Sequence, residues 1–275
     1  MRRRASTSPA LLGLLVCAGL TGLPLAGCSS DQPSTVAVAP SVEGAGADAA
    51  RAVIETAAEA HGGLAALRAA AEWVAEVRRH QRGESYVVTS HYRPGMVRME
   101  QDLGDGARSA DVIGHPHCWG MDGPVSIPCS DETRENDRPR VIMEMAVQIW
   151  PLLEDDWELL DVVGRAVDGE SYDVVTARYL PRDSVARLTF DGETHLLRRI
   201  AVDGVKHGVS GTHIHDFSDY RDFCGVQMPA RNEKSFEGET WVAEDVLELD
   251  CRPVDQSLFL RPPQVEEGTL VATPE

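Results

Sequence analysis

The chain has 275 residues and a formal net charge of −18, from 44 acidic and 26 basic side chains. The length allows one large domain or two small ones. The acidic excess argues against a nucleic-acid partner, and it also argues against electrostatic attachment to anionic lipid.

Residues 1–27 have the layout of a cleaved export signal. Three arginines near the start precede an apolar run, and small residues lead to Cys28. The apolar run is too short, and too interrupted by Gly and Pro, to be a transmembrane span. The box Leu25-Ala26-Gly27-Cys28 resembles the lipobox of bacterial lipoproteins, in which the cysteine is acylated and becomes the new N-terminus. This resemblance implies that Cys28 is the first residue of the mature protein and carries its lipid.

A lipidated Cys28 would hold the protein on a membrane without crossing it. Each buried methylene group of an acyl chain contributes about 0.8 kcal/mol, so several chains on one residue give a durable anchor. We therefore expect a lipid-anchored protein of the bacterial cell envelope, on the outer membrane and facing the periplasm. The alternative is an ordinary secretory signal with an incidental cysteine. Residues 28–47, rich in Ser, Pro, Gly and Ala, predict a flexible tether.

The first predicted elements are two helices. From Asp48 the apolar residues fall at helical spacing, and His61-Gly62-Gly63 ends the run. A second short helix is predicted for residues 64–71. The apolar period then changes to two, which predicts short antiparallel strands separated by turns rich in Gly and Pro: residues 73–77, 86–92, 96–103 and 107–113, followed by a cysteine hairpin over 116–130.

Residues 138–153 interrupt the strands and predict an inserted helix. Pro139 suits its first turn, and one helical stripe is apolar: Val141, Ile142, Met145, Ile149 and Leu152. Strands then resume, with turns predicted at Asp168-Gly169, Asp191-Gly192 and Asp203-Gly204, over residues 157–165, 172–180, 185–190, 196–202, 211–220, 226–236 and 240–251. About a dozen strands argue for one large curled sheet or barrel, because a flat sheet of that width would not be stable.

Four cysteines remain in the predicted mature domain, and an even number in an exported protein favours disulfides. Two-residue turns at 237–238 and 123–124 would place cysteines opposite each other in two hairpins: Cys224 with Cys251, and Cys118 with Cys129. Both pairs are candidate cross-strand disulfides, although a β-bulge would shift either register by one residue. The alternative is a thiolate metal site, against which the lack of a C-x-x-C pair argues.

Several phrases between residues 50 and 262 stand out together: Ala60-His61-Gly62-Gly63 followed by Leu67, Phe190-Asp191-Gly192-Glu193-Thr194-His195-Leu196-Leu197-Arg198, Tyr220-Arg221-Asp222-Phe223-Cys224-Gly225-Val226-Gln227-Met228-Pro229, Gly238, and Leu258-Phe259 before Pro262. They resemble the broad group of outer-membrane lipoprotein-sorting-like proteins, which share the periplasmic lipoprotein carrier fold. The resemblance implies that residues 48–262 form a curved antiparallel sheet, an incompletely closed β-barrel covered by helices, and that residues 263–275 form a tail.

In carriers of this group the apolar concave side of the sheet holds acyl chains of lipids or lipoproteins. The chain departs from the carriers in its predicted permanent anchor, its cysteine pairs and its acidic charge. A tethered protein cannot ferry cargo freely across a periplasm, so we expect a receiving, sensing or local binding role instead.

Two histidines on one predicted strand are candidate metal ligands. The segment Thr212-His213-Ile214-His215-Asp216 places His213 and His215 on the same face of a predicted strand, which is a metal-ligand geometry. Without a third convergent ligand, exposed histidines on a polar strand face are the simpler interpretation. The sequence shows no nucleophile elbow, phosphate-cradling glycine loop or HExxH element. We therefore expect neither catalysis nor a cofactor.

The sequence as a whole predicts a membrane-anchored envelope lipoprotein that binds a lipid, an acyl chain or a lipoprotein in a half-barrel cavity. The candidate cavity residues lie on the inserted helix, with two tryptophans at the rim and core packing as the alternative for each: Val141, Ile142, Met145, Ile149, Trp73 and Trp150. A second hypothesis is a non-enzymatic sensor or scaffold that binds another envelope protein. A third is a metal-binding envelope protein that uses His213 and His215.

Overall fold

The computed structural model describes residues 46–104, 107–114, 117–122 and 125–262. The predicted signal (1–27), Cys28, nearly all of the predicted tether (28–47) and the predicted tail (263–275) lie outside the described residues. The expectations about them stay predictions.

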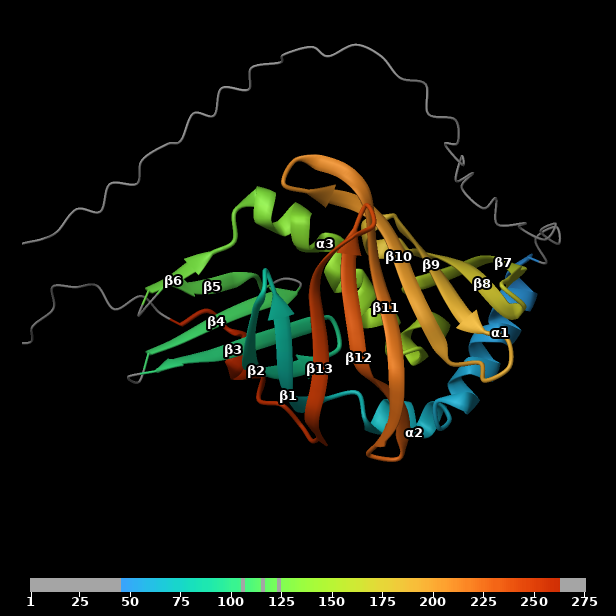
Figure 1. The fold of residues 1–275 in the computed structure, drawn as a ribbon, viewed down its shortest axis with the longest axis horizontal. Coiled ribbons are helices and arrows are strands. Elements are labelled where there is room, and N and C mark those ends of the chain that lie inside the picture. The colour runs from blue at the N-terminus through green and yellow to red at the C-terminus, as the bar shows by residue number, and fades with distance from the viewer. Residues whose placement is uncertain (1–45, 105–106, 115–116, 123–124, 263–275) are drawn as a thin grey trace, which may run out of the picture. The chain divides into compact units, whose positions relative to one another are not determined.

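The described residues build one antiparallel sheet of 13 strands. One meander runs from β1 to β6 and another from β7 to β13, and the pairing of β1 with β13 joins them. Because β6 and β7 are free edges, the curved sheet is not closed (Figure 1). This is the open half-barrel that the sequence predicts. Its strands are β1 (Trp73–Gln81), β2 (Glu84–Arg93), β3 (Met96–Gly104), β4 (Ala107–Gly114), β5 (Trp119–Asp122), β6 (Val125–Pro128), β7 (Trp157–Val167), β8 (Glu170–Tyr179), β9 (Ser184–Asp191), β10 (Leu197–Lys206), β11 (Val209–Phe223), β12 (Val226–Phe236) and β13 (Glu239–Cys251).

Helices cover part of the sheet: α1 (Gly46–Ala60), α2 (Leu64–Ala69), α3 (Asp131–Ala146) and the 3-10 helices η1 (Trp150–Leu153), η2 (Leu180–Arg182) and η3 (Gln256–Phe259). The helix α1 packs against β7 and β8, and its Ile54 is fully buried. The helix α3 connects the edge strands β6 and β7 and packs mainly against β10 (Figure 1). Among these helices, none combines the length and apolar character that crossing a membrane requires.

The inserted helix begins earlier than the sequence predicts. Ser130 caps it, because its hydroxyl accepts a hydrogen bond from the backbone N–H of Thr133 at 3.0 Å. Asp131 and Glu132 in the first turn complement the positive end of the helix dipole. Pro139 consequently lies inside α3 and not in its first turn, which corrects the predicted start.

The inserted helix also ends earlier than predicted, at Ala146. Ile149 adopts a left-handed backbone conformation, with φ of 61°, between α3 and η1. The prediction that Ile149 continues the apolar stripe of the helix is therefore wrong. Its side chain is fully buried in the core, because the turn into η1 folds it inward.

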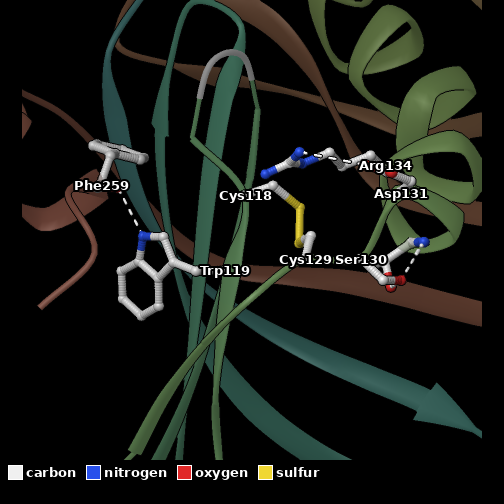
Figure 2. Close-up of a disulfide and its surroundings, with 8 residues drawn as sticks. Cys118, Trp119, Cys129, Ser130, Asp131, Arg134 and Phe259 are labelled. Carbon is white, nitrogen blue, oxygen red and sulfur yellow. Dashed lines mark hydrogen bonds and ion pairs between the residues drawn. A yellow bond between two sulfur atoms is a disulfide. The ribbon is translucent and has the colours of Figure 1, made fainter. Parts of the chain in front are cut away.

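The disulfide Cys118–Cys129 closes the hairpin of β5 and β6 in the predicted register. Trp119 pairs with Pro128, and the backbone N–H of Cys129 donates to the carbonyl oxygen of Cys118 at 3.1 Å. Figure 2 shows the disulfide beside Ser130, the cap of α3. On the other side, Trp119 Nε1 donates to the carbonyl oxygen of Phe259 at 2.9 Å. The disulfide thus fixes the point at which α3 leaves the sheet edge.

The disulfide Cys224–Cys251 is present too, but the strand register differs by one residue from the prediction. A bulge between Lys234 and Ser235 shifts the rest of β12 against β13. Cys224 lies in the turn between β11 and β12, where Phe223 pairs with Val226, and its disulfide reaches Cys251 at the end of β13.

Two of the sequence segments that carry the family resemblance, residues 60–63 and 220–229, contact each other in the structure. The carbonyl oxygen of His61, after α1, accepts a hydrogen bond from the backbone N–H of Gln227 at 2.9 Å, and its ring meets the edge of Tyr220 at 5.6 Å. A Cβ atom at Gly62 would lie 2.7 Å from the carbonyl oxygen of Gly225. The residues that end α1 can therefore pack against the turn between β11 and β12 only because position 62 has no side chain.

Gly204 allows α3 to lie directly on β10. A Cβ atom at this position would lie 2.3 Å from Cγ of Pro139. The sequence predicts a turn at Asp203-Gly204, but both residues belong to β10, and the turn is at His207-Gly208. The prediction is wrong because this glycine serves a close approach of helix to strand and not a reversal of the chain.

Replacing Gly204 by alanine should therefore destabilise the fold by about 1–3 kcal/mol, because α3 must move to admit the methyl group. The matched control is Gly164→Ala in β7, where the added Cβ would meet no atom within 4 Å. The control should change stability by no more than about 1 kcal/mol. Urea denaturation of the two variants measures the difference, and equal free energies of unfolding would contradict this account.

Candidate functional site

The helix α3 separates two cavities on the inner face of the sheet. Its residues Arg138, Val141, Ile142 and Met145 lie on one face and line a cavity of about 590 Å³, which we call the apolar cleft. The other face carries Asn136, Arg140 and Met143 and lines a second cavity of about 500 Å³, which we call the cationic cavity. The side chain of Asp137 contributes to both.

The apolar cleft lies between α3, η1 and the strands at both ends of the sheet. Its walls are mainly apolar and aromatic: Tyr92, Ile113, Val141, Ile142, Met145, Trp150, Pro151, Trp157 and Tyr179. Charged side chains also contribute: Arg134, Asp137, Arg138, Glu154, Asp156 and Arg182. The volume lies within the range of about 300–1,000 Å³ that is usual for small-molecule sites. Such a cleft can take an apolar ligand that carries a polar end.

The structure places the six predicted cavity residues in three environments. Four of them line the apolar cleft: Val141, Ile142, Met145 and Trp150. Trp73 lines a smaller cavity of about 90 Å³ and stacks on Tyr92, with ring centroids 5.0 Å apart. Ile149 packs in the core and lines neither cavity.

Beneath α3 lies a buried charge cluster, which we define as Arg79, Glu144, Lys234 and Glu244. Lys234 Nζ is 3.2 Å from Glu144 Oε1 and 3.0 Å from Glu244 Oε2, and only 4% of the lysine side chain is exposed. Arg79 Nε lies 3.0 Å from Glu244 Oε1. The cluster thus ties α3 to β1, β12 and β13 by charge.

The electrostatics of this cluster favour the ionised forms. Burial alone would raise the pKa of Glu244, but the neighbouring cations Lys234, Arg79 and Arg140 outweigh it and hold that pKa well below the usual range. Arg140 lies 3.8 Å from Glu144 through its Nε atom and donates to the sulfur of Met99 at 3.0 Å. The helix α3 therefore brings both a carboxylate, from Glu144, and a guanidinium group, from Arg140, to the inner face of the sheet.

The histidines His213 and His215 are buried, with 6% and 4% of each residue exposed. This corrects the prediction that they are exposed on a polar face, because α3 covers this face of β11. Burial lowers the pKa of both, and for His215 the nearby Lys234 lowers it further. His213 Nε2 lies 3.3 Å from the carbonyl oxygen of Val205. In the described part of the chain, no group of three or more His, Cys, Asp or Glu side chains is placed to hold a metal ion.

The buried charge cluster was not predicted from the sequence, although the alternation of buried positions along β1 and β13 indicates it. Arg79 follows Ala75 and Val77 at every second position of β1, and all three side chains are buried. Glu244 follows Val242 in the same way on β13. A charged residue that continues a buried apolar alternation on two predicted strands indicates a buried ion pair.

Comparisons with known proteins bear on the fold. No protein-family model matches the sequence, and no curated protein matches it. Among solved structures, a LolA superfamily protein from Nitrosomonas europaea matches with a TM-score of 0.50 and 12% identity, covering 77% of this chain and 97% of its own. An outer membrane lipoprotein-sorting protein domain from Vibrio parahaemolyticus matches with a TM-score of 0.50 and 9% identity, covering 78% of this chain and 97% of its own.

This chain shares their fold. The likeness agrees with the resemblance seen in the sequence and with the open, curved sheet. Identities this low identify the architecture and do not transfer a ligand or a residue role.

Removing Lys234 should destabilise the protein strongly. In Lys234→Met, Glu144 loses a buried partner and Glu244 loses one of its two ion-pair partners, so we expect a loss of about 3–5 kcal/mol. The matched control is Arg231→Met on the same strand, where the side chain is 42% exposed and paired with Glu233 and Asp245. The control should cost less than about 1 kcal/mol in urea denaturation. Similar losses in the two variants would refute a buried, coupled cluster.

Stability should fall in two steps as the pH is lowered. The folded state holds the pKa of His215 below its ordinary value of 6.5 and that of Glu244 below 4.5. Both groups therefore bind protons more readily when unfolded, so their contributions are complete above those values and are lost as the pH falls below them.

His215→Gln should flatten the loss of stability between about pH 7 and 5, and Glu244→Gln should flatten the loss below about pH 4.5. His207→Gln, which replaces an exposed histidine, is the control for the first variant. Urea midpoints measured across the pH range test both expectations. A His215→Gln curve parallel to that of the unchanged protein would contradict the first.

Proposed function

We propose that this protein is a non-enzymatic, lipid-anchored component of the bacterial envelope that binds an acyl chain of a lipid or lipoprotein in the apolar cleft. The apolar cleft is the main support for this proposal. It combines the required volume, apolar and aromatic walls on α3 and η1, and several charged side chains. An acyl chain would cover the walls, and its polar end would lie among the charged groups.

The fold likeness supports this proposal. The two solved structures reported above are described in terms of LolA or lipoprotein sorting. The predicted anchor at Cys28 makes a local, receiving role more plausible than shuttling, because the anchor would keep the cleft within tether reach of one membrane. The acidic net charge of −18 is consistent with attachment by the lipid alone.

The first experiment is native mass spectrometry of residues 30–275, expressed in an oxidising compartment and purified without detergent. A bound phospholipid or fatty acid would support the proposal. A clean apo mass would favour the sensor or scaffold hypothesis, in which the protein binds another envelope protein.

A direct binding test uses a brominated fatty acid, which quenches tryptophan fluorescence on contact. Trp150 and Trp157 line the cleft, so binding should quench them. Val141→Asp should weaken binding at least about tenfold, because a carboxylate would have to be buried against the acyl chain.

The matched control is Val87→Asp on β2, at a residue that is 42% exposed and does not line the cleft. It should bind the fatty acid as the unchanged protein does. Equal quenching in the two variants would place the acyl chain outside the apolar cleft. Thermal unfolding of both variants checks that each is folded.

A further inference from the structure

The cationic cavity collects basic side chains from three separate segments. Arg82 comes from the turn between β1 and β2, Arg140 from α3 and Lys206 from the end of β10. The imidazoles of His207, His213 and His215 also line the cavity. Asp137 is the one carboxylate among the lining residues.

This concentration of positive charge is unexpected in so acidic a chain. Acidic residues outnumber basic ones 44 to 26, and the sequence contains only two lysines, Lys206 and Lys234. Lys234 belongs to the buried charge cluster and has two carboxylate partners. Lys206 lines the cationic cavity, so both lysines lie on the inner face of the sheet.

Two cations of the cavity, Lys206 and Arg82, have no ion-pair partner among the described residues, whereas Arg140 has Glu144. Lys206 Nζ lies 4.3 Å from the ring centroid of Trp241 and 5.7 Å from that of Phe236. Within the described residues, neither Lys206 nor Arg82 has a carboxylate within the 4.0 Å of an ion pair. Arg140 Nε is buried without a hydrogen-bond acceptor, and its carboxylate partner is 3.8 Å away.

Partial burial and repulsion from Arg82 lower the pKa of Lys206, and attraction to Glu239 offsets only part of this effect. The protein thus holds two like charges near each other at the wall of an open cavity, with an aromatic ring behind one of them. An anion between them would relieve this repulsion. Guanidinium groups match oxyanions through paired N–H donors, and a group with charge on several oxygens can meet cations from several sides.

We propose that the cationic cavity binds a phosphate-bearing ligand, with Lys206 and Arg82 as its charged contacts and Arg140 at the inner end. The phosphate could belong to a lipid headgroup or to a free phosphate compound. This site lies on the opposite face of α3 from the apolar cleft and does not depend on an acyl ligand being bound there.

The test uses the full-length protein in an uncharged detergent and follows its tryptophan fluorescence, to which Trp241 at the cavity wall contributes, during titration. The probes are inorganic pyrophosphate and dihexanoyl phosphatidic acid, at constant ionic strength. Lys206→Met and Arg82→Gln each remove one charge, and the methionine keeps the aliphatic stem over Trp241. The matched control is Arg165→Gln, which removes an exposed positive charge from β7, away from the cavity.

We expect saturable binding of at least one probe, weakened about tenfold by Lys206→Met or Arg82→Gln and unchanged by Arg165→Gln. Equal affinity for the two probes would identify a free phosphate compound as the ligand class. A clear preference for phosphatidic acid, weakened by the same two cavity variants, would identify a lipid headgroup.

The proposal is overturned if neither probe binds, or if the cavity variants bind as the control does. A thermal unfolding scan of each variant separates loss of binding from loss of fold. Binding of pyrophosphate with no binding of a brominated fatty acid would support this site while removing the acyl-chain proposal, so the two can fail independently.

Discussion

The pairing of β1 with β13 is the constraint on which the rest of the structure depends. It joins the first strand of the chain to the last in the middle of the sheet, and without it the chain would form two separate meanders. Its register places Arg79 directly opposite Glu244, so the pairing also creates the central ion pair of the buried charge cluster. Pairing strands so far apart in the sequence closes a large loop. The chain entropy lost on closing this loop must be offset by the contacts that the pairing creates.

The charge cluster then determines where α3 can lie. Glu144 faces Lys234, Pro139 rests on Gly204, and the hydroxyl of Tyr92 donates to the carbonyl oxygen of Glu144 at 2.9 Å. These contacts hold the helix against the sheet at three places. A helix fixed along the middle of a curved sheet leaves space on both of its sides, and the two cavities follow from that placement.

The local elements were predictable because each has a short-range signal. The turns around Glu237-Gly238 and Asp168-Gly169, the strand alternation and both cysteine pairs could be read from neighbouring residues. The half-barrel followed from the number of strands and from the family resemblance. Of the six candidate residues, Val141, Ile142 and Met145 line the apolar cleft because they occupy one stripe of α3, and Trp150 lines it from η1.

What could not be predicted depends on contacts between distant segments. Gly204 looks like a turn residue until Pro139 is seen above it. His213 and His215 look exposed until α3 covers them, and Lys234 looks like a surface residue until Glu144 approaches from the helix. In each case the deciding partner is more than 60 residues away and lies on another element, so no local pattern contains it. The one-residue shift near Cys224 is similar, because a bulge depends on packing across the sheet.

The opposed charges of the chain and of the cationic cavity have a consequence for how any anion could reach it. A net charge of −18 repels anions at long range, but at physiological ionic strength this field is screened over about 8 Å. Contacts inside the cavity are screened much less, because Lys206 and Arg140 are partly buried. The protein should therefore discriminate against anions in general and accept only a ligand that enters the cavity. This is the behaviour expected of a specific site and not of a basic surface that attracts any anionic membrane.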